Sequence, residues 1–492
     1  MKIFETNGAA GPLEPTLTEK VARGTAWVFG IRFVNQLFYF GRIVILARLL
    51  APRDFGLFGI AMFVLGILDA VSQPGLQQAI IQKKESSKDY MDAAWTAMVI
   101  RGVALSVLMW CLAPSAARFF NVPEARTIIQ IMSLSIFIQA FTNISIVSIQ
   151  KEMQFHKQFV YQVVISTVDF TVSIVAAFLL RSPWALVLGV LAGQTVGLIV
   201  SYAILPYKPR FHPDFRKVLE LTKFGRWIFA TNILLFAMAN GDDAFVGKVL
   251  GAAMLGFYQM AYRISKTPSS EITHIISQVT FPAFSKIQKN VEKLKDSYMN
   301  VLHLSTFFAF PVAGLLLALA PEFTQLVLGA KWMPIVPALR ILCVFGLFSS
   351  VNSSFGPIFY AIGRPSIMTK NVLIALVTQA VLIYPLTKAL KLPGTALTVV
   401  LSYLVCLIVM LRHVEKSLGL RTREILRRIG PHAGMTAVIM GLVFLTKALL
   451  GKPLGLPLTF LASLSIGLVV YLFYGRSFIP LFRPYWKAVW RR

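Results

Sequence analysis

Long apolar stretches recur along the whole chain, separated by short polar or Pro/Gly-containing segments. A helix needs about 20 residues to cross the hydrocarbon layer of a bilayer, and each stretch is long enough for one crossing. The pattern therefore predicts an all-α polytopic membrane protein with fourteen transmembrane helices. The predicted spans are residues 24–47, 55–80, 91–117, 127–149, 159–180, 184–205, 227–247, 252–276, 299–320, 334–361, 371–390, 393–411, 431–450 and 455–475.

Composition and charge agree with a membrane-embedded chain. Apolar and aromatic residues make up 56% of the 492 residues, and charged residues only 14%, which is more apolar than a soluble domain. The net charge is +27. If the connections between the predicted spans are numbered in chain order, the two termini and the even-numbered connections hold 31 Lys and Arg residues. The odd-numbered connections, with the adjoining span ends, hold 11. Because cytoplasmic loops carry the cation excess, we expect both termini in the cytoplasm, with the cations near anionic headgroups and not on nucleic acid.

The chain contains a weak internal repeat with an offset of 200 residues. Trp27 aligns with Trp227 and Gly56 with Gly256, among six identities in 39 positions. We interpret the repeat as two pseudo-symmetric six-helix bundles with a substrate path between them, followed by two C-terminal helices. The expected organisation is a cytoplasmic or interfacial segment at 1–23, bundles at 24–206 and 227–411, a basic cytoplasmic linker at 207–226, a basic cytoplasmic loop at 412–430, helices 13 and 14 at 431–475 and a basic tail at 476–492.

Charged side chains inside the predicted spans are the main candidates for functional residues. Each would cost about 2.5–3.5 kcal/mol at a lipid-facing helix centre, so we expect them to face a water-filled cavity, to pair with one another or to snorkel toward a span end. An excess of cations favours an anionic substrate such as a diphosphate, because guanidinium groups bind phosphate oxygens bidentately. The cation candidates are Arg32, Arg42, Arg101, Arg263, Lys266 and Arg340, and the charge-pair or gating candidates are Asp69, Asp169, Asp242, Asp243 and Glu271.

Equivalent positions of the two halves suggest a gate and hinges. Arg42 aligns with Asp242 at the 200-residue offset, so these opposite charges are expected to pair when the outer side closes. Pro74, Gly75 and Pro268 interrupt the second span and its counterpart, and breaks at corresponding positions of two halves indicate a transport site. They are hinge candidates, although such prolines also kink packed helices that do not move.

No motif in the sequence indicates an enzyme. A nucleophile elbow, a Walker A loop and a dinucleotide fingerprint are all missing, and the three Cys and six His residues lack metal-ligand spacing. We therefore expect a transporter with no catalytic residue, no metal, no cofactor and no direct use of ATP.

Three segments resemble the polysaccharide-transporter family, the Wzx-like flippases of the multidrug/oligosaccharidyl-lipid/polysaccharide (MOP) superfamily. They are Ala-Arg-Leu-Leu-Ala-Pro-Arg-Asp-Phe-Gly at 47–56, Gln-Pro-Gly-Leu-Gln-Gln-Ala-Ile-Ile-Gln at 73–82, and a glycine pattern at 243–262 that ends in Tyr-x2-Ala-Tyr. The resemblance covers about residues 20 to 430, and within the group the chain is similar to colanic-acid-type exporters.

The resemblance implies two six-helix bundles in a V shape and export of undecaprenyl-diphosphate-linked oligosaccharide units by alternating access. It implies a role in O-antigen, capsule or exopolysaccharide biosynthesis at the bacterial inner membrane, with the lipid-linked oligosaccharide and the phospholipid bilayer as partners. Contact with polysaccharide polymerase or assembly proteins stays open. The family's cationic cavity is assigned only loosely to the six cations above, because no invariant cation pattern can be matched residue by residue.

Three other functions also fit parts of the sequence. A MATE-like drug/cation antiporter of the same superfamily requires acids that dominate the central cavity, whereas cations dominate here. A membrane polymerase or glycosyltransferase acting on lipid-linked sugars should have a large external loop, whereas the outer connections are short. A scaffold for an assembly complex could use the basic segment 412–428 for docking, although the positive-inside rule also explains its charge.

Overall fold

The computed structural model describes residues 17–72, 88–151, 154–204, 207–287 and 290–476, and every regular element in these ranges is a helix. The first part forms α1 (Leu17–Leu49), α2 (Pro52–Ser72), α4 (Lys88–Phe120), α5 (Ala125–Ala140), α6 (Ile146–Lys151), α7 (Phe155–Leu180) and α8 (Trp184–Ile204). The second part forms α9 (Phe215–Val249), α10 (Ala252–Ile287), α11 (Val291–Ala318), α12 (Ala320–Phe323), the π-helix η1 (Thr324–Leu328), the 3-10 helix η2 (Ala330–Ile335), α13 (Val336–Asn352), α14 (Phe355–Ala361), α15 (Pro365–Leu390), α16 (Leu392–Leu418) and α17 (Thr422–Arg476).

The described residues contain eleven helices that are long and apolar enough to cross a bilayer. The chain is therefore an all-helical, multi-pass membrane protein, as the apolar pattern predicts. Within the expected linker at 207–226, α9 begins at Phe215, and within the expected loop at 412–430 only residues 419–421 connect α16 to α17. Hydropathy does not detect these helix ends, because their basic turns are helical but not apolar.

Two predicted spans are interrupted in the structure. Residues 127–149 are divided between α5 and α6, and residues 334–361 between α13 and α14. At the first break the side chain of Asn143 donates from Nδ2 to the carbonyl oxygen of Tyr207 (2.6 Å) and accepts from the amide of Ser145 (3.0 Å). The first bond satisfies a carbonyl of the connection after α8, and the second satisfies the amide of the residue that precedes α6, so the break is locally stabilised.

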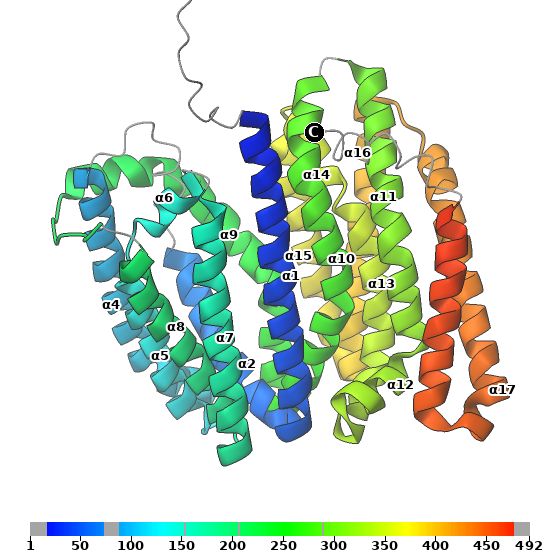
Figure 1. Ribbon diagram of the computed structural model, residues 1–492, viewed down its shortest axis with the longest axis horizontal. Helices are drawn as coiled ribbons and strands as arrows, with labels where there is room; N and C mark the ends of the chain where they lie inside the picture. Colours follow the sequence, from blue (N-terminus) through cyan, green and yellow to red (C-terminus); the bar gives the residue numbers. More distant parts are fainter. Residues whose placement is uncertain (1–16, 73–87, 152–153, 205–206, 288–289, 477–492) are drawn as a thin grey trace, which may run out of the picture.

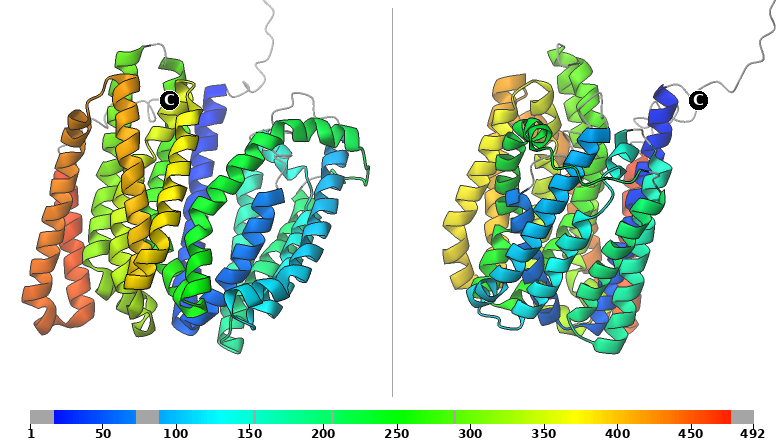
Figure 2. Two further views of the ribbon diagram at one scale, coloured as in Figure 1. Left: turned by 180° about the vertical axis from the view of Figure 1, so that it is seen from behind. Right: turned by 90° about the vertical axis from the view of Figure 1, so that its left-hand side faces the viewer.

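The helices form two groups that are in contact near one end of the molecule. In Figure 1 and Figure 2, α4–α8 stand on one side and α10–α17 on the other, with α1 between them. α2 packs against α10, α9 packs against α2 and α4, and α1 packs against η1. Side-chain contacts join residues 47–66 and 119–120 to residues 236–259 and 326–332. We call this region, where α1 ends and α2 begins, the closed end.

Two glycines bring α2 and α10 into backbone contact at the closed end. A Cβ atom added at Gly56 would overlap the carbonyl oxygen of Ala252, and one added at Gly256 would overlap the carbonyl oxygen of Pro52. Only glycine permits such a close approach of two backbones. Pro52 and Ala252 are also 200 residues apart, so the two contacts are related in the same way as the halves of the sequence repeat.

Hydrogen bonds to backbone carbonyls join α1 to the η1–η2 segment at the same end. Arg48 donates to the last carbonyls of η1, with a distance of 3.0 Å from its Nε to the oxygen of Val327. In return, Lys331 Nζ donates to the carbonyl oxygen of Arg48 (2.9 Å) and Trp332 Nε1 to that of Ala47 (2.8 Å). This carbonyl clasp satisfies helix-terminal carbonyls on both sides and connects the two groups of helices.

Polar contacts hold α17 against the second group. Lys447 Nζ lies 2.7 Å from Glu322 Oε1 and 3.0 Å from the carbonyl oxygen of Ala318. Elsewhere along α17, His432 Nε2 lies 2.9 Å from Nδ1 of His303, and both residues are buried. The helices predicted as 13 and 14 are therefore packed on α11 and α12.

We predict that Lys447→Met lowers the thermal stability of the purified protein in detergent. The substitution leaves the Glu322 carboxylate without its cation, and the side chain of Glu322 is only 11% exposed. Removing one partner of a buried ion pair costs about 3–5 kcal/mol. The matched control is Lys295→Met, since Lys295 pairs with a Glu292 side chain that is 79% exposed, and such a surface pair contributes at most about 1 kcal/mol. Equal melting temperatures for the two variants would contradict the prediction.

Candidate functional site

A cavity of about 410 Å³ lies between α1 and α7. Two predicted cations, Arg32 and Arg42, line it together with the predicted acid Asp169. Amides, a hydroxyl group and aromatic rings provide the remaining lining: Asn35, Gln36, Gln162, Ser166, Phe38, Tyr39 and Phe170. We call this space the α1–α7 cavity.

Two polar layers, two helical turns apart, join α1 to α7 at this cavity. In the first, Asn35 Nδ2 donates to Gln162 Oε1 (3.3 Å) and Asn35 Oδ1 accepts from Ser166 Oγ (2.8 Å). In the second, the guanidinium group of Arg42, a residue that is 8% exposed, pairs with the carboxylate of Asp169. Both layers have the same register, because the partners are separated by 127 residues in each.

We predict that Asp169→Asn destabilises the protein by up to about 3 kcal/mol, the lower limit for a broken buried pair, because the Asp169 side chain is 26% exposed. Thermal unfolding in detergent measures the effect. The charge-swapped variant Arg42→Asp/Asp169→Arg should recover most of the loss. The control swap Arg42→Asp/Asp242→Arg should not, and recovery in that variant would show that the assigned partner is wrong.

The predicted gate pair between Arg42 and Asp242 is not formed in this structure. Asp242 is 2% exposed and accepts a hydrogen bond of 2.5 Å from the hydroxyl group of Tyr258. Arg42 is instead neutralised by Asp169, which lies in the same part of the chain. The 200-residue offset indicates equivalent positions in two halves, and equivalence does not require that two side chains meet.

A second cavity, of about 260 Å³, lies between α9 and α10. Two cation candidates, Arg263 and Lys266 from α10, and one charge-pair or gating candidate, Asp243 from α9, line it. Gln259 Nε2 donates to Asp243 Oδ2 (2.9 Å), and Lys266 Nζ lies 5.2 Å from the ring centroid of Tyr262. The spacing from Gln259 to Lys266 is two turns, which places these side chains on one face of α10. We call this space the α9–α10 cavity.

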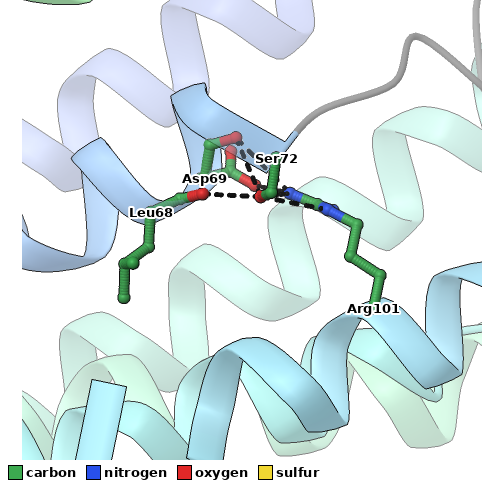
Figure 3. A network of polar contacts seen from close by, with 4 residues as sticks. All are labelled: Leu68, Asp69, Ser72 and Arg101. Carbon is green, nitrogen blue, oxygen red and sulfur yellow. Dashed lines mark hydrogen bonds and ion pairs between the residues drawn. The ribbon is translucent and has the colours of Figure 1, made fainter. Parts of the chain in front are cut away.

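Two predicted cations lie outside both cavities. Arg101 pairs locally with Asp69: its Nη2 lies 2.5 Å from Asp69 Oδ1 and 2.8 Å from Ser72 Oγ (Figure 3). Ser72 in turn donates to the carbonyl oxygen of Leu68 (2.5 Å), so the network joins the end of α2 to α4. Arg340 is exposed on α13. Neither residue lines the α1–α7 or the α9–α10 cavity.

Sequence comparison gives the family. A profile of the polysaccharide biosynthesis protein family matches residues 45–337, which is more than half of the chain. The protein belongs to this family. The lipopolysaccharide biosynthesis protein WzxC of Escherichia coli K12 is 28% identical over 364 residues, covering 72% of this chain and 73% of WzxC. The succinoglycan biosynthesis transport protein ExoT of Rhizobium meliloti is 25% identical over 365 residues, covering 72% of each chain.

Solved structures share the fold of this polysaccharide biosynthesis protein. The lipid II flippase MurJ, in an inward closed conformation, matches with a TM-score of 0.75 and 16% identity over 93% of this chain and 99% of MurJ. An inward-facing multidrug resistance MATE family transporter of the MOP superfamily matches with a TM-score of 0.64 and 16% identity, over 78% of this chain and 94% of the transporter. At these identities the likeness establishes the transporter fold.

Some predicted site residues of this family member stay untested. Pro74 and Gly75 lie outside the described residues. α10 runs as a helix through the positions of Pro268 and Glu271, and the side chains at these positions also lie outside the described part of the chain. The hinge and Glu271 assignments therefore remain predictions.

Sequence reasoning missed the neutral polar residues of the α1–α7 cavity. Gln36, Tyr39 and Ser166 carry no charge, so a search for intramembrane charges does not detect them. A usable signal was present: Asn35 precedes a predicted cation by seven residues, and Gln162 precedes a predicted acid by seven residues. Side chains that repeat every seven residues lie on one helix face, which indicates a continuous polar stripe on each helix.

Proposed function

We propose that the protein is a flippase that exports undecaprenyl-diphosphate-linked oligosaccharide units across the bacterial inner membrane, for O-antigen, capsule or exopolysaccharide biosynthesis. The observation that carries the proposal is the lining of the two cavities, each of which has two cations and one acid. Family membership and the names of WzxC and ExoT support a polysaccharide precursor as the substrate. The fold shared with the flippase MurJ supports transport of a lipid-linked molecule.

The proposed topology has fourteen crossings with both termini in the cytoplasm. Eleven of these crossings are the apolar helices described above. The other three would be α5, which has 16 residues, and α9 and α10, which have 35 and 36 residues. The charges of the α9–α10 cavity lower the hydropathy of these two long helices. Residues 24–206 and 227–411 would then form two six-helix bundles, and residues 431–475 the last two crossings. The cation excess on one side supports the orientation.

In this orientation the closed end faces outward, and the substrate path opens to the cytoplasm. The glycine contacts and the carbonyl clasp would keep the outer side shut while the cavity cations compensate the diphosphate. The isoprenoid tail would remain in lipid. An inside-negative potential favours outward movement of two negative charges by roughly 4–5 kcal/mol per 100 mV. Alternating access would then release the unit to polymerase or assembly proteins on the outer side.

An antiporter function is less well supported than flipping. A drug/cation antiporter requires acids that dominate its cavity, and the linings of both cavities have the opposite balance. An unchanged drug sensitivity in a strain that lacks the gene would be consistent with this choice.

Deletion of the gene tests the proposal. We expect surface polymer to disappear and lipid-linked repeat units to accumulate in the inner leaflet, which can be measured by extraction and mass spectrometry. Wild-type protein and the Arg340→Gln variant should both restore the polymer, because Arg340 lies outside the cavities. Normal surface polymer without accumulated intermediates would contradict the flippase assignment.

A further inference from the structure

We infer that the α1–α7 cavity is a sugar-binding subsite, which takes a saccharide of the lipid-linked substrate while the cations of the α9–α10 cavity compensate the diphosphate. This inference rests on the proposed function and adds to it a separate site for the sugar. It reassigns Arg42 from a diphosphate ligand to a structural member of a polar layer, and it assigns a role to neutral residues that the charge pattern does not reveal.

The hydrogen-bonding groups of the cavity suit hydroxyl groups better than phosphate. A sugar hydroxyl both donates and accepts, and a side-chain amide offers two donors beside an acceptor oxygen. Gln36, Gln162 and Asn35 all line the cavity. Gln36 makes no hydrogen bond to any other residue that the structure describes, so both ends of its amide can meet a ligand. A phosphate accepts only, and the amide oxygens of such a lining would repel it.

Aromatic rings provide the second component of a saccharide site. Phe38, Tyr39 and Phe170 line the cavity, and Phe38 meets Phe170 edge to face with centroids 5.4 Å apart. The face of an aromatic ring carries partial negative charge, and the C–H groups on the face of a sugar ring carry partial positive charge. The ring faces and the amides are therefore complementary to the apolar faces and the polar edge of one sugar.

The two cavities have the same balance of charged residues but differ in how the acid is held and in size. In the α1–α7 cavity Asp169 pairs with Arg42, its Oδ1 also lies 3.3 Å from Ser173 Oγ, and Arg32 is the second cation of the lining. In the α9–α10 cavity Arg263 and Lys266 lie on one helix face, and the acid there is held by a glutamine. The volume of about 410 Å³ falls within the usual range for small-molecule sites, roughly 300–1,000 Å³, whereas about 260 Å³ suits a compact diphosphate.

α1 has a polar face and an apolar face, and it stands between the two groups of helices (Figure 1, Figure 2). The apolar face exposes Phe33 (62% exposed), Leu37 (65%) and Phe40 (40%), a spacing typical of a lipid-facing stripe. Asn35 and Arg42 lie on the opposite face, where polar groups avoid the cost of contact with hydrocarbon. Gln36 lies one turn before Phe40, at the border between the two faces, and still lines the cavity.

Binding measurements on the purified full-length protein test the inference. The probes are the lipid-linked repeat unit extracted from a host strain that lacks the gene, and undecaprenyl diphosphate without sugar. We expect Gln36→Leu and Gln162→Leu each to weaken binding of the repeat unit about tenfold, while binding of undecaprenyl diphosphate stays within about twofold. Arg263→Leu should weaken both probes in parallel. Gln139→Leu is the matched control, because Gln139 is exposed on α5 and lines neither cavity.

A further variant keeps the test decisive. Gln36→Glu retains an acceptor for sugar hydroxyls but adds a negative charge, so it should retain more repeat-unit binding than Gln36→Leu, whereas a diphosphate site would lose both probes. Parallel loss of both probes in the glutamine variants, or equal wild-type affinity for the two probes, would overturn the sugar assignment. Failure of the proposed function has a different signature: the deletion strain accumulates no repeat unit, and wild-type protein does not bind undecaprenyl diphosphate. Unchanged melting temperatures identify the variants that fold normally.

Discussion

Replacing Gly56 by valine should reduce lipid flipping in proteoliposomes by about 5- to 150-fold. The new side chain would overlap the carbonyl oxygen of Ala252, and a backbone atom cannot rotate away as a side chain does. Overpacking alone typically costs about 1–3 kcal/mol, and this cost applies only when α2 and α10 are in contact. Gly256→Val should act in the same way through the carbonyl oxygen of Pro52.

The expected cause is a shift in conformation, not a loss of folding. A cysteine placed at Gln259, in a background without the native cysteines, should react faster with a membrane-impermeant thiol reagent added from outside when Gly56 is valine. Gly241→Ala is the matched control, because an added Cβ at Gly241 meets no atom within 4 Å. Normal flipping by Gly56→Val would mean that the glycine contact is not required for transport.

Removing both cations of the α9–α10 cavity should cause the largest loss of substrate affinity. A hydrogen bond to a charged group contributes about 1.5–3 kcal/mol, so the variant Arg263→Leu/Lys266→Met should bind undecaprenyl diphosphate roughly 10²- to 10⁴-fold more weakly. Both residues line the same cavity, with a single acid opposite them. Equilibrium binding to the purified protein measures the loss.

Two control substitutions separate the effect of lost charge on affinity from the effect of altered packing. One keeps the charge within the cavity, and the other removes a charge outside both cavities. Lys266→Arg keeps the charge and should retain most of the affinity, although a guanidinium group and an ammonium group are not equivalent. Arg340→Gln removes one cation outside both cavities and should leave the affinity within about twofold of wild type. An Arg263→Leu/Lys266→Met variant that binds as tightly as Arg340→Gln would show that the diphosphate lies elsewhere.

Apolar stretches in the sequence predicted the all-helical, multi-pass character of the chain, and eleven described helices are long and apolar enough to cross a bilayer, since lipid imposes a strong length and composition rule. The 200-residue offset also singled out Gly56 and Gly256, which meet the opposite helix in equivalent ways. The partners of the intramembrane charges could not be derived. Arg42 lies 127 residues from Asp169 in the sequence, and no local pattern specifies which helix faces another across such a separation.

Cavity composition was predictable only for charged members. Arg263 and Lys266 were detected because their cost in lipid is high, whereas Gln36 and Ser166 cost less and are common in packed helices. Arg101 and Asp69 were both identified as candidates, and pairing was one of the expected outcomes; the structure shows that they form a local pair. The high free-energy cost of a charged side chain in lipid thus indicates that the charge needs an ion-pair partner or water. It does not indicate which of the two is present.

The carbonyl clasp tolerates amino-acid substitutions at its acceptor residues. All of its acceptors are main-chain oxygens, and every amino acid supplies one, so the residues at positions 47, 326 and 327 can be exchanged without removing an acceptor. The chemistry is confined to three donor side chains, Arg48, Lys331 and Trp332. Descendants of this chain can therefore diverge widely around the clasp and still inherit the same closure, provided that the three donors and the helix ends stay in register.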